Sequence, residues 1–166
     1  DLAKSLGICM IDIDSVTTLD LVVDGADEID SHKQMIKGGG AALFREKIVA
    51  NMAKEMIVIV DESKVVDYLG KFPLAIEITP FAFMATLTEI EKFGNGANLR
   101  TTPDNSPLIT DNGNYIVDLK LEFPCKNPER LHVELKLIPG VCETGLLINM
   151  AGRVIIGYDD GHVEIR

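Results

Sequence analysis

The chain has 166 residues, of which 46% are hydrophobic and 25% are charged, a composition typical of a folded globular protein. It carries 26 acidic and 16 basic residues, and the net charge of −10 argues against nucleic acid and anionic membrane surfaces as partners. No apolar run reaches the roughly 18 residues of a membrane-spanning helix, so no membrane partner is expected. Cys9, Cys125 and Cys142 have no CxxC spacing, which favours reduced thiols in a cytoplasmic protein over a disulfide framework or a zinc site.

The beginning of the chain is typical of a helix end followed by two strands. Residues 1–7 predict the last turn of a helix that Gly7 caps, and because a domain rarely starts there we expect further sequence upstream. Residues 8–13 form an apolar run of strand length, and residues 19–23 form a second, β-branched run.

The next segments have the order that an α/β layer requires. Residues 24–30 predict a loop of small and acidic residues, and Lys37-Gly-Gly-Gly40 leads into an amphipathic helix over residues 41–54. Residues 56–60 are almost continuously apolar, as in parallel strands that are covered on both faces. The pattern therefore predicts an α/β fold with a parallel sheet.

The pattern changes near Pro73 and returns near residue 147. We expect a half-buried strand over residues 74–79, helices over 81–93 and 128–137, and strands over 98–102, 108–110, 115–119, 141–148, 153–158 and 163–165. The Asn-Gly pair within residues 111–114 predicts a hairpin turn. We therefore expect one domain over residues 1–72 and 147–166, and a smaller α+β domain inserted over residues 73–146.

Two acidic residues follow the second predicted strand, in Asp24-Gly-Ala-Asp27. Open α/β sheets bind ligands at the carboxyl ends of their strands, so these carboxylates are candidate ligand contacts. Asp and Gly are also the commonest turn residues, and spacing alone favours a solvated turn.

The segment Lys37-Gly-Gly-Gly40 is the second candidate. Consecutive glycines let backbone amides approach a ligand closely, and the helix that follows offers its positive end. The segment matches neither the Walker pattern nor GxGxxG, so a nucleotide site is only weakly indicated and a flexible connector fits equally well.

Glu46 lies in the predicted helix, where a lone glutamate is usually solvated. Together with Asp24, Asp27 and Lys37 it completes the set of groups that can move a proton beside a carbonyl and hold the oxyanion that forms. Lys64 follows the next strand and is a candidate contact for a substrate phosphate, although such a lysine is usually a surface residue.

The chain resembles ribose-5-phosphate isomerase of type A. The resemblance runs in order through essentially the whole chain, which makes it more specific than any single motif. The segments that carry it are Val22-Val-Asp-Gly-Ala-Asp-Glu-Ile29, Met35-Ile-Lys-Gly-Gly-Gly-Ala-Ala-Leu43, Arg45-Glu-Lys-Ile-Val-Ala50, Val60-Asp-Glu-Ser-Lys64, Leu69-Gly-Lys-Phe-Pro-Leu74, Thr110-Asp-Asn-Gly-Asn114, Ile138-Pro-Gly-Val141 and Asp160-Gly161. The Thr-Gly-Ser-Thr phosphate loop of the family is not among them, which agrees with the expected upstream sequence.

The resemblance implies a Rossmann-like parallel-sheet domain with an inserted smaller α+β domain. It also implies interconversion of ribose 5-phosphate and ribulose 5-phosphate through an enediolate in the non-oxidative pentose phosphate pathway, with no metal and no organic cofactor. The implied proton-transfer base is Glu46, and the implied catalytic partners are Asp24, Asp27 and Lys37. The implied substrate-binding residues are Asp24, Gly25, Ala26, Asp27, Lys37, Gly38, Gly39, Gly40 and Lys64.

Other functions stay open at this point. A sugar-phosphate deaminase would need a histidine-containing catalytic cluster, and His32, His132 and His162 are scattered. A non-catalytic sugar-phosphate binding or regulatory module of the same fold group would keep Lys37 and the glycines but could dispense with Glu46. A purely structural domain with no site would not explain why four segments with candidate site residues occur in the right order along the chain. We expect a homodimer or homotetramer that binds a small-molecule sugar phosphate.

Overall fold

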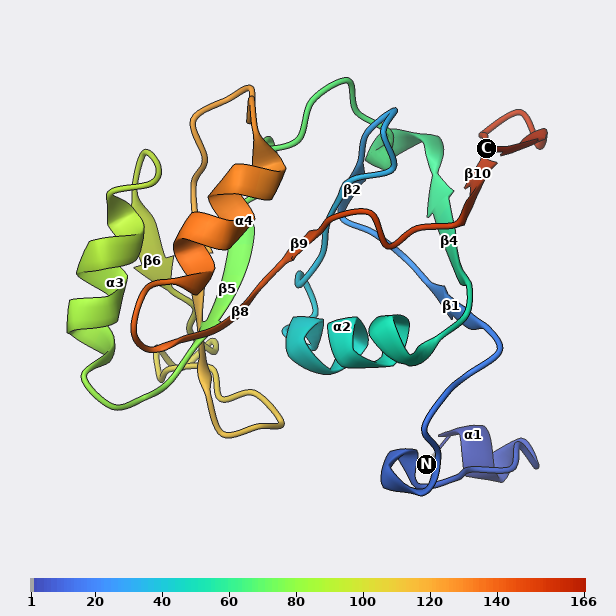
Figure 1. Cartoon of the computed structure of the whole chain (residues 1–166), viewed down its shortest axis with the longest axis horizontal. Helices are drawn as coiled ribbons and strands as arrows, with labels where there is room; N and C mark the ends of the chain where they lie inside the picture. The colour runs from blue at the N-terminus through green and yellow to red at the C-terminus, as the bar shows by residue number, and fades with distance from the viewer. Residues whose placement is uncertain (1) are drawn as a thin grey trace.

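A computed structural model of the chain describes residues 2–166, so the prediction for Asp1 lies outside the described residues. Figure 1 shows two lobes, with the helix after the glycine loop packed between them. The helices are α1 (Leu2–Ser5), α2 (Leu43–Met52), α3 (Phe83–Glu91) and α4 (Pro128–Lys136), with 3-10 turns η1 (Ile13–Ser15) and η2 (Glu62–Lys64). The strands are β1 (Val22–Asp24), β2 (Glu28–Ile29), β3 (Met35–Ile36), β4 (Met56–Asp61), β5 (Leu74–Ile78), β6 (Ala97–Leu99), β7 (Tyr115–Leu119), β8 (Val141–Thr144), β9 (Leu146–Leu147), β10 (Arg153–Gly157) and β11 (Val163–Ile165).

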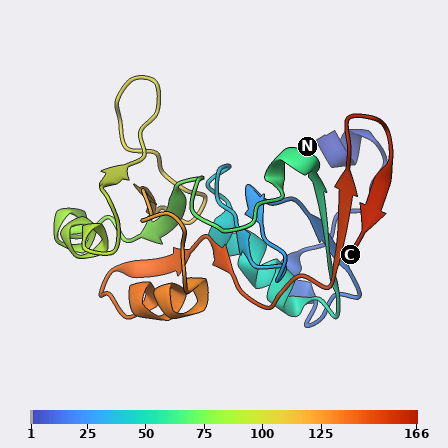
Figure 2. The ribbon, with the colours of Figure 1, turned by 90° about the horizontal axis from the view of Figure 1, so that it is seen from above.

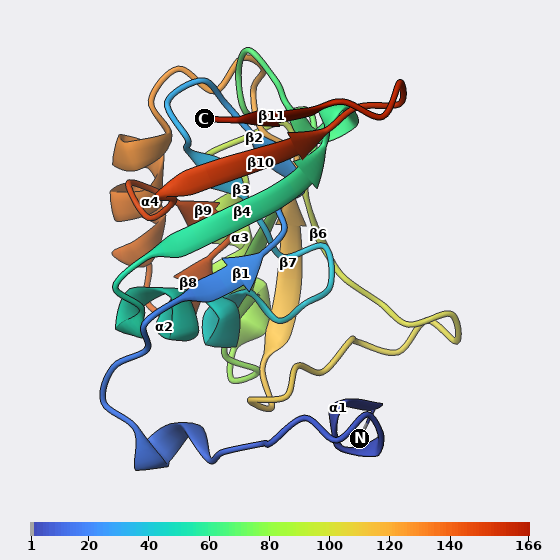
Figure 3. The same ribbon diagram turned by 90° about the vertical axis from the view of Figure 1, so that its right-hand side faces the viewer.

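The first lobe contains the predicted parallel sheet. Its strand order is β1-β4-β10-β11, with β1, β4 and β10 parallel and β11 antiparallel at the edge, as Figure 3 shows. One face of this sheet is buried in a core that includes Met56, Val58, Val154 and Ile156. The structure confirms the Rossmann-like α/β fold, because the apolar run at β4 forms the centre of a parallel sheet. The expectation that this strand is covered on both faces is wrong, because Ile59 of β4 and Val23 of β1 are about half exposed on the second face of the sheet.

The second lobe is the inserted α+β part. Its antiparallel sheet has the order β6-β7-β5-β8, and α3 and α4 lie on one side of it (Figure 2). The expectation of a half-buried strand over residues 74–79 is wrong, because every residue of β5 is buried. Leu43 of α2 packs against Ala75 and Ile116 on the second face of the sheet, so both faces of β5 are covered.

Three other strand predictions are also wrong. Residues 8–13 form no strand, and Ile8, Met10 and Ile11 are each more than half exposed, because this segment runs away from the sheet edge where it would need a partner (Figure 3). Residues 108–110 make a single strand-like pair, from Ile109 to Tyr115. The predicted strand over residues 141–148 divides at Gly145 into β8 and β9, which belong to different sheets.

The third sheet, β2-β3-β9, lies between the lobes and was not predicted in full. Its strands have two residues each, too short for a repeating pattern of apolar residues to mark them. No helix among residues 2–166 combines the length and the apolar character needed to cross a bilayer.

Glu28 of β2 ties this small sheet to the link that leads into the inserted part. Its buried carboxylate accepts hydrogen bonds from the amides of Gly70, at 2.7 Å, and Phe72, at 2.6 Å. Glu28→Ala is expected to lower the free energy of unfolding by about 3 kcal/mol, because it leaves one buried and one partly buried donor without a charged acceptor. Urea unfolding measures the change, with the exposed Glu122→Ala as the control. Equal stability of the two variants would contradict this prediction.

Candidate active site

The ammonium group of Lys37 lies at the centre of the candidate site. Lys37 follows β3, is buried, and places its Nζ 3.0 Å from Asp24 Oδ2 and 3.4 Å from Glu46 Oε2. Its Nζ also donates to the carbonyl oxygen of Gly25 at 2.7 Å. Three segments that are separate in the sequence therefore converge on one buried cation.

Local structure explains why these three side chains meet. Asp24 is the last residue of β1, so its carboxylate lies at the carboxyl end of the parallel sheet, where such sheets bind ligands. Glu46 lies in the first turn of α2, where the helix dipole favours a negative charge. The predicted gathering of Asp24, Lys37 and Glu46 is therefore present in the fold.

The glycine loop has a conformation that only glycine adopts easily. Gly38 has φ +109°, and a Cβ there would lie 2.7 Å from Ala75 Cβ and 2.8 Å from a methyl carbon of Leu43. The amide of Gly39 donates to Asp27 Oδ2 at 2.8 Å. Asp27 therefore holds the loop in place, whereas Asp24 contacts Lys37, so the structure gives the two aspartates different contacts.

Burial and charge act in opposite directions on Glu46. Burial raises the pKa of its carboxyl group, Lys37 lowers it, and the charges of Asp24 and Asp27 raise it, so that the pKa is raised overall. A carboxylate with a raised pKa is better matched to taking up and returning a proton near neutral pH. The site can therefore supply a base beside a cation that can stabilise an oxyanion.

Comparison with known proteins identifies the family. The family model described as ribose 5-phosphate isomerase A (phosphoriboisomerase A) matches residues 1–161. The chain belongs to the ribose 5-phosphate isomerase A family. Its members are aldose–ketose isomerases, so the resemblance stated from the sequence is confirmed.

Relatives and solved structures agree with this assignment. Ribose-5-phosphate isomerase A of Protochlamydia amoebophila (strain UWE25) is 52% identical over 163 residues, which are 98% of this chain and 70% of that protein. A solved D-ribose-5-phosphate isomerase in complex with phospho-erythronic acid is 42% identical, with a TM-score of 0.93 over 99% of this chain and 72% of that one. The ribose 5-phosphate isomerase of Plasmodium falciparum is 33% identical, with a TM-score of 0.94 and coverage of 99% and 72%.

Among the other residues predicted for the isomerase site, Gly25 joins the Lys37 cluster through its carbonyl oxygen. Gly25, Ala26 and Lys64 line one open hollow of about 550 Å³ at the ends of β4 and β10. Lys64 is the last residue of η2, directly after β4, on the side of the sheet where it was expected. Gly40 is exposed and follows the constrained part of the loop. Their roles in binding remain predictions.

Sequence reasoning missed two residues that support the isomerase site from the inserted part. The guanidinium of Arg100 donates to the carbonyl oxygens of Gly38, at 2.8 Å, and Gly39, at 3.1 Å. It also donates from Nε to Asp118 Oδ2 at 2.8 Å and from Nη2 to Asp118 Oδ1. The amide of Lys37 donates to the carbonyl oxygen of Gly145 at 2.8 Å. Neither residue belongs to a segment that resembles a motif, so no signal in the sequence pointed to them. Among residues 2–166, no group of three acidic, histidine or cysteine side chains is arranged to hold a metal ion.

Proposed function

We propose that the chain interconverts D-ribose 5-phosphate and D-ribulose 5-phosphate through a cis-enediolate, with Glu46 as the proton-transfer base. The observation that carries the mechanism is the position of the Lys37 ammonium between the carboxylates of Asp24 and Glu46. The family assignment supports the reaction, and the raised pKa of Glu46 supports its role.

The steps follow from the chemistry of an aldose. The carboxylate of Glu46 removes the proton from C2 of the open-chain sugar, the C1–C2 double bond forms, and the electron pair of the carbonyl moves onto O1. A proton then passes from O2 to O1, and Glu46 returns its proton to C1, which leaves a ketone at C2. Lys37 stabilises the negative oxygen, and Asp24, which shares the ammonium with Glu46, is placed to relay the hydroxyl proton.

The site has to supply more than a base. General acid–base catalysis contributes about 10²–10⁴-fold, so preorganised charge and positioning must supply much of the remaining acceleration. Lys37 is held in advance by two carboxylates and a carbonyl, so it does not have to reorganise when the oxyanion forms. We assign substrate binding to the segments 24–27 and 37–40 and to Lys64.

Isomerisation in D₂O tests the proton-transfer mechanism. The gene product that carries this chain is incubated with ribose 5-phosphate, and NMR follows ribulose 5-phosphate and the deuterium bound to C1 and C2. We expect turnover with solvent deuterium on both carbons, because a proton held by a carboxylate exchanges with water. A sample without protein measures the uncatalysed exchange.

Two outcomes, one from this experiment and one from a separate binding measurement, would overturn the proposal. Turnover to equilibrium without deuterium on either carbon would mean that hydrogen moves directly between the carbons with its electron pair. Binding of phospho-erythronic acid without any turnover of ribose 5-phosphate would mean that the chain is a non-catalytic sugar-phosphate binding module.

We further propose that the chain forms a homodimer or homotetramer through the inserted part. Phe81 is 88% exposed and Leu137 77% exposed, and Phe81 borders a hollow of about 330 Å³ next to Pro139. Large exposed apolar side chains beside a hollow are typical of interfaces. Light scattering is expected to report an oligomer that Phe81→Asp dissociates, whereas Leu6→Asp, at an exposed site in the N-terminal segment, leaves it intact. A monomeric wild-type protein would contradict this.

We also propose a cytoplasmic location and the two-domain division predicted above. The thiols of Cys9, Cys125 and Cys142 are all free, as in a reducing compartment. The division of the 141–148 segment between two sheets supports a boundary beside Gly145. Cell fractionation tests the cytoplasmic location, and limited proteolysis tests the two-domain division.

A further inference from the structure

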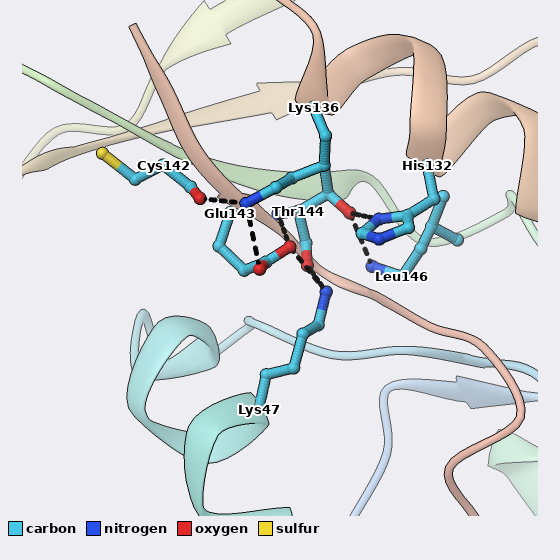
Figure 4. Close-up of polar contacts among 7 residues, drawn as sticks. All are labelled: Lys47, His132, Lys136, Cys142, Glu143, Thr144 and Leu146. Carbon is cyan, nitrogen blue, oxygen red and sulfur yellow. Dashed lines mark hydrogen bonds and ion pairs between the residues drawn. The ribbon is translucent and has the colours of Figure 1, made fainter. Parts of the chain in front are cut away.

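A buried ion pair connects the helix that carries Glu46 to the inserted part. Lys47, the next residue of α2, donates from Nζ to Glu143 Oε1 at 2.8 Å and to the carbonyl oxygen of Thr144 at 2.6 Å. The side chains of Lys47 and Glu143 are only 13% and 15% exposed. Figure 4 shows Lys47 extending from α2 to the backbone and side chains of β8.

The surroundings of Glu143 hold this pair in one geometry. Lys136 of α4 places Nζ 3.2 Å from Glu143 Oε2, and the amide of Thr144 donates to Oε1 at 2.8 Å. Burial alone would raise the pKa of Glu143, but Lys47, Thr144 and Lys136 lower it overall. His132 Nδ1 lies 2.7 Å from Thr144 Oγ1, and burial, helped by Lys47, lowers the pKa of His132 (Figure 4).

Residues 45–47 of α2 make three contacts in three directions. Successive residues of a helix are turned by about 100°, so Arg45, Glu46 and Lys47 point to different neighbours. The guanidinium of Arg45 contacts Asp111 in the hairpin turn, Glu46 contacts Lys37, and Lys47 contacts β8. The Arg45 pair is exposed and therefore weak, whereas a buried pair is costly to break.

We propose that Lys47 is a positioning residue for the isomerase reaction, which fixes the rotation of α2 and thereby the carboxylate of Glu46 relative to Lys37. The inference rests on the proposed role of Glu46 as the base. Leu43 also anchors α2, but apolar packing is non-directional, and the directed bonds of Lys47 set the angle of the helix. A displacement of about 1 Å in a reacting group can cost about 10²-fold in rate.

Lys47→Met tests the inference, because it keeps the unbranched chain as far as Cε and removes only the ammonium. In the gene product that carries this chain, we expect kcat to fall about tenfold while KM changes less than about twofold, since the substrate contacts are retained. Lys54→Met is the matched control, because the Lys54–Asp20 ion pair lies just beyond the same helix and is exposed. Glu143→Gln is expected to show a similar loss, and the double variant to lose little more, because both changes break the same Lys47–Glu143 ion pair.

The pH profile separates positioning from a merely structural role. The charges that act on the pKa of Glu46 are those of Lys37, Asp24 and Asp27, so removing the Lys47 charge should not act on it directly. If Glu46 moves away from Lys37, it loses the contact that lowers its pKa, and the acidic limb of kcat/KM moves to higher pH. Circular dichroism at the assay temperature confirms that each variant is folded.

The outcomes distinguish this inference from the proposed function. Unchanged kcat in Lys47→Met, together with loss of activity in Glu46→Gln, would overturn the inference alone. A fall in kcat that only follows the unfolded fraction, with the acidic limb unmoved, would also overturn it, because Lys47 would then be structural. Full activity in Glu46→Gln would overturn the proposed base itself.

Discussion

Glu46→Gln is expected to lower kcat by about 10³-fold, within the usual range for general acid–base catalysis, with little change in KM. The amide keeps the shape of the side chain near Lys37, but it cannot accept a proton from carbon at neutral pH. Substrate binding is retained because the Asp24–Lys37 contact stays in place. The rate of ribulose 5-phosphate formation measures the effect, with Glu91→Gln at an exposed site of α3 as the control.

The same residue sets the expected pH dependence. Glu46 acts as a base only when it is ionised, so wild-type kcat/KM should fall as the pH falls through the pKa of Glu46. That pKa is raised above its usual value of 4.5, mainly by burial, so the limb lies above pH 4.5. The titration of kcat/KM should lose this limb in Glu46→Gln. An unchanged limb in the variant, or equal kcat in variant and wild type, would assign proton transfer to another group.

The parts of the fold that the sequence predicted are those with long, regular patterns. The run at β4 is apolar along most of its length, and α2 could be located because it lies between a glycine loop and that strand. The amphipathic character expected of this helix is wrong, because Ile48 is exposed whereas the Lys47 side chain is largely buried. Residues 8–13 have the same apolar character and yet form no strand, because a strand also needs a neighbouring backbone. Pairing is a property of the fold and leaves no mark on a six-residue segment.

The candidate site likewise contains some residues that could be predicted from the sequence and others that could not. Asp24 could be placed at a ligand-binding edge because it follows a predicted strand of a parallel sheet. Its meeting with Lys37 was implied by the resemblance to the isomerase family, because Lys37 follows β3 of the third, antiparallel sheet. The contact of Arg100 with the glycine loop could not be predicted, because Arg100 reaches the loop from a different sheet, more than 60 residues later in the chain. The different contacts of Asp24 and Asp27 also depend on the path of the backbone, which determines which carboxylate meets an amide and which meets an ammonium.

Gly145→Ala is expected to destabilise the junction of the two lobes strongly. Gly145 lies between β8 and β9, and its amide donates to the carbonyl oxygen of Ala75 at 2.7 Å while its own carbonyl accepts from the amide of Lys37. A Cβ at this position would lie 2.1 Å from the carbonyl oxygen of Lys37 and 3.1 Å from that of Ala75. Both neighbours are backbone atoms, so they cannot move aside as the end of a flexible side chain would.

Two effects should follow from this overlap. The free energy of unfolding should fall by about 3 kcal/mol, at the upper end of the usual cost of overpacking, and kcat/KM should fall by about 10²-fold in the folded fraction, because Lys37 is displaced. Gly157→Ala is the matched control for stability, because a Cβ on Gly157 of β10 would meet no atom within 4 Å. Its activity is not used as a control, because Gly157 lines the hollow that contains Lys64. Urea unfolding is measured on both variants, and substrate turnover is compared between Gly145→Ala and the wild type. If Gly145→Ala is as stable as Gly157→Ala and as active as the wild type, Gly145 does not hold Lys37 in place.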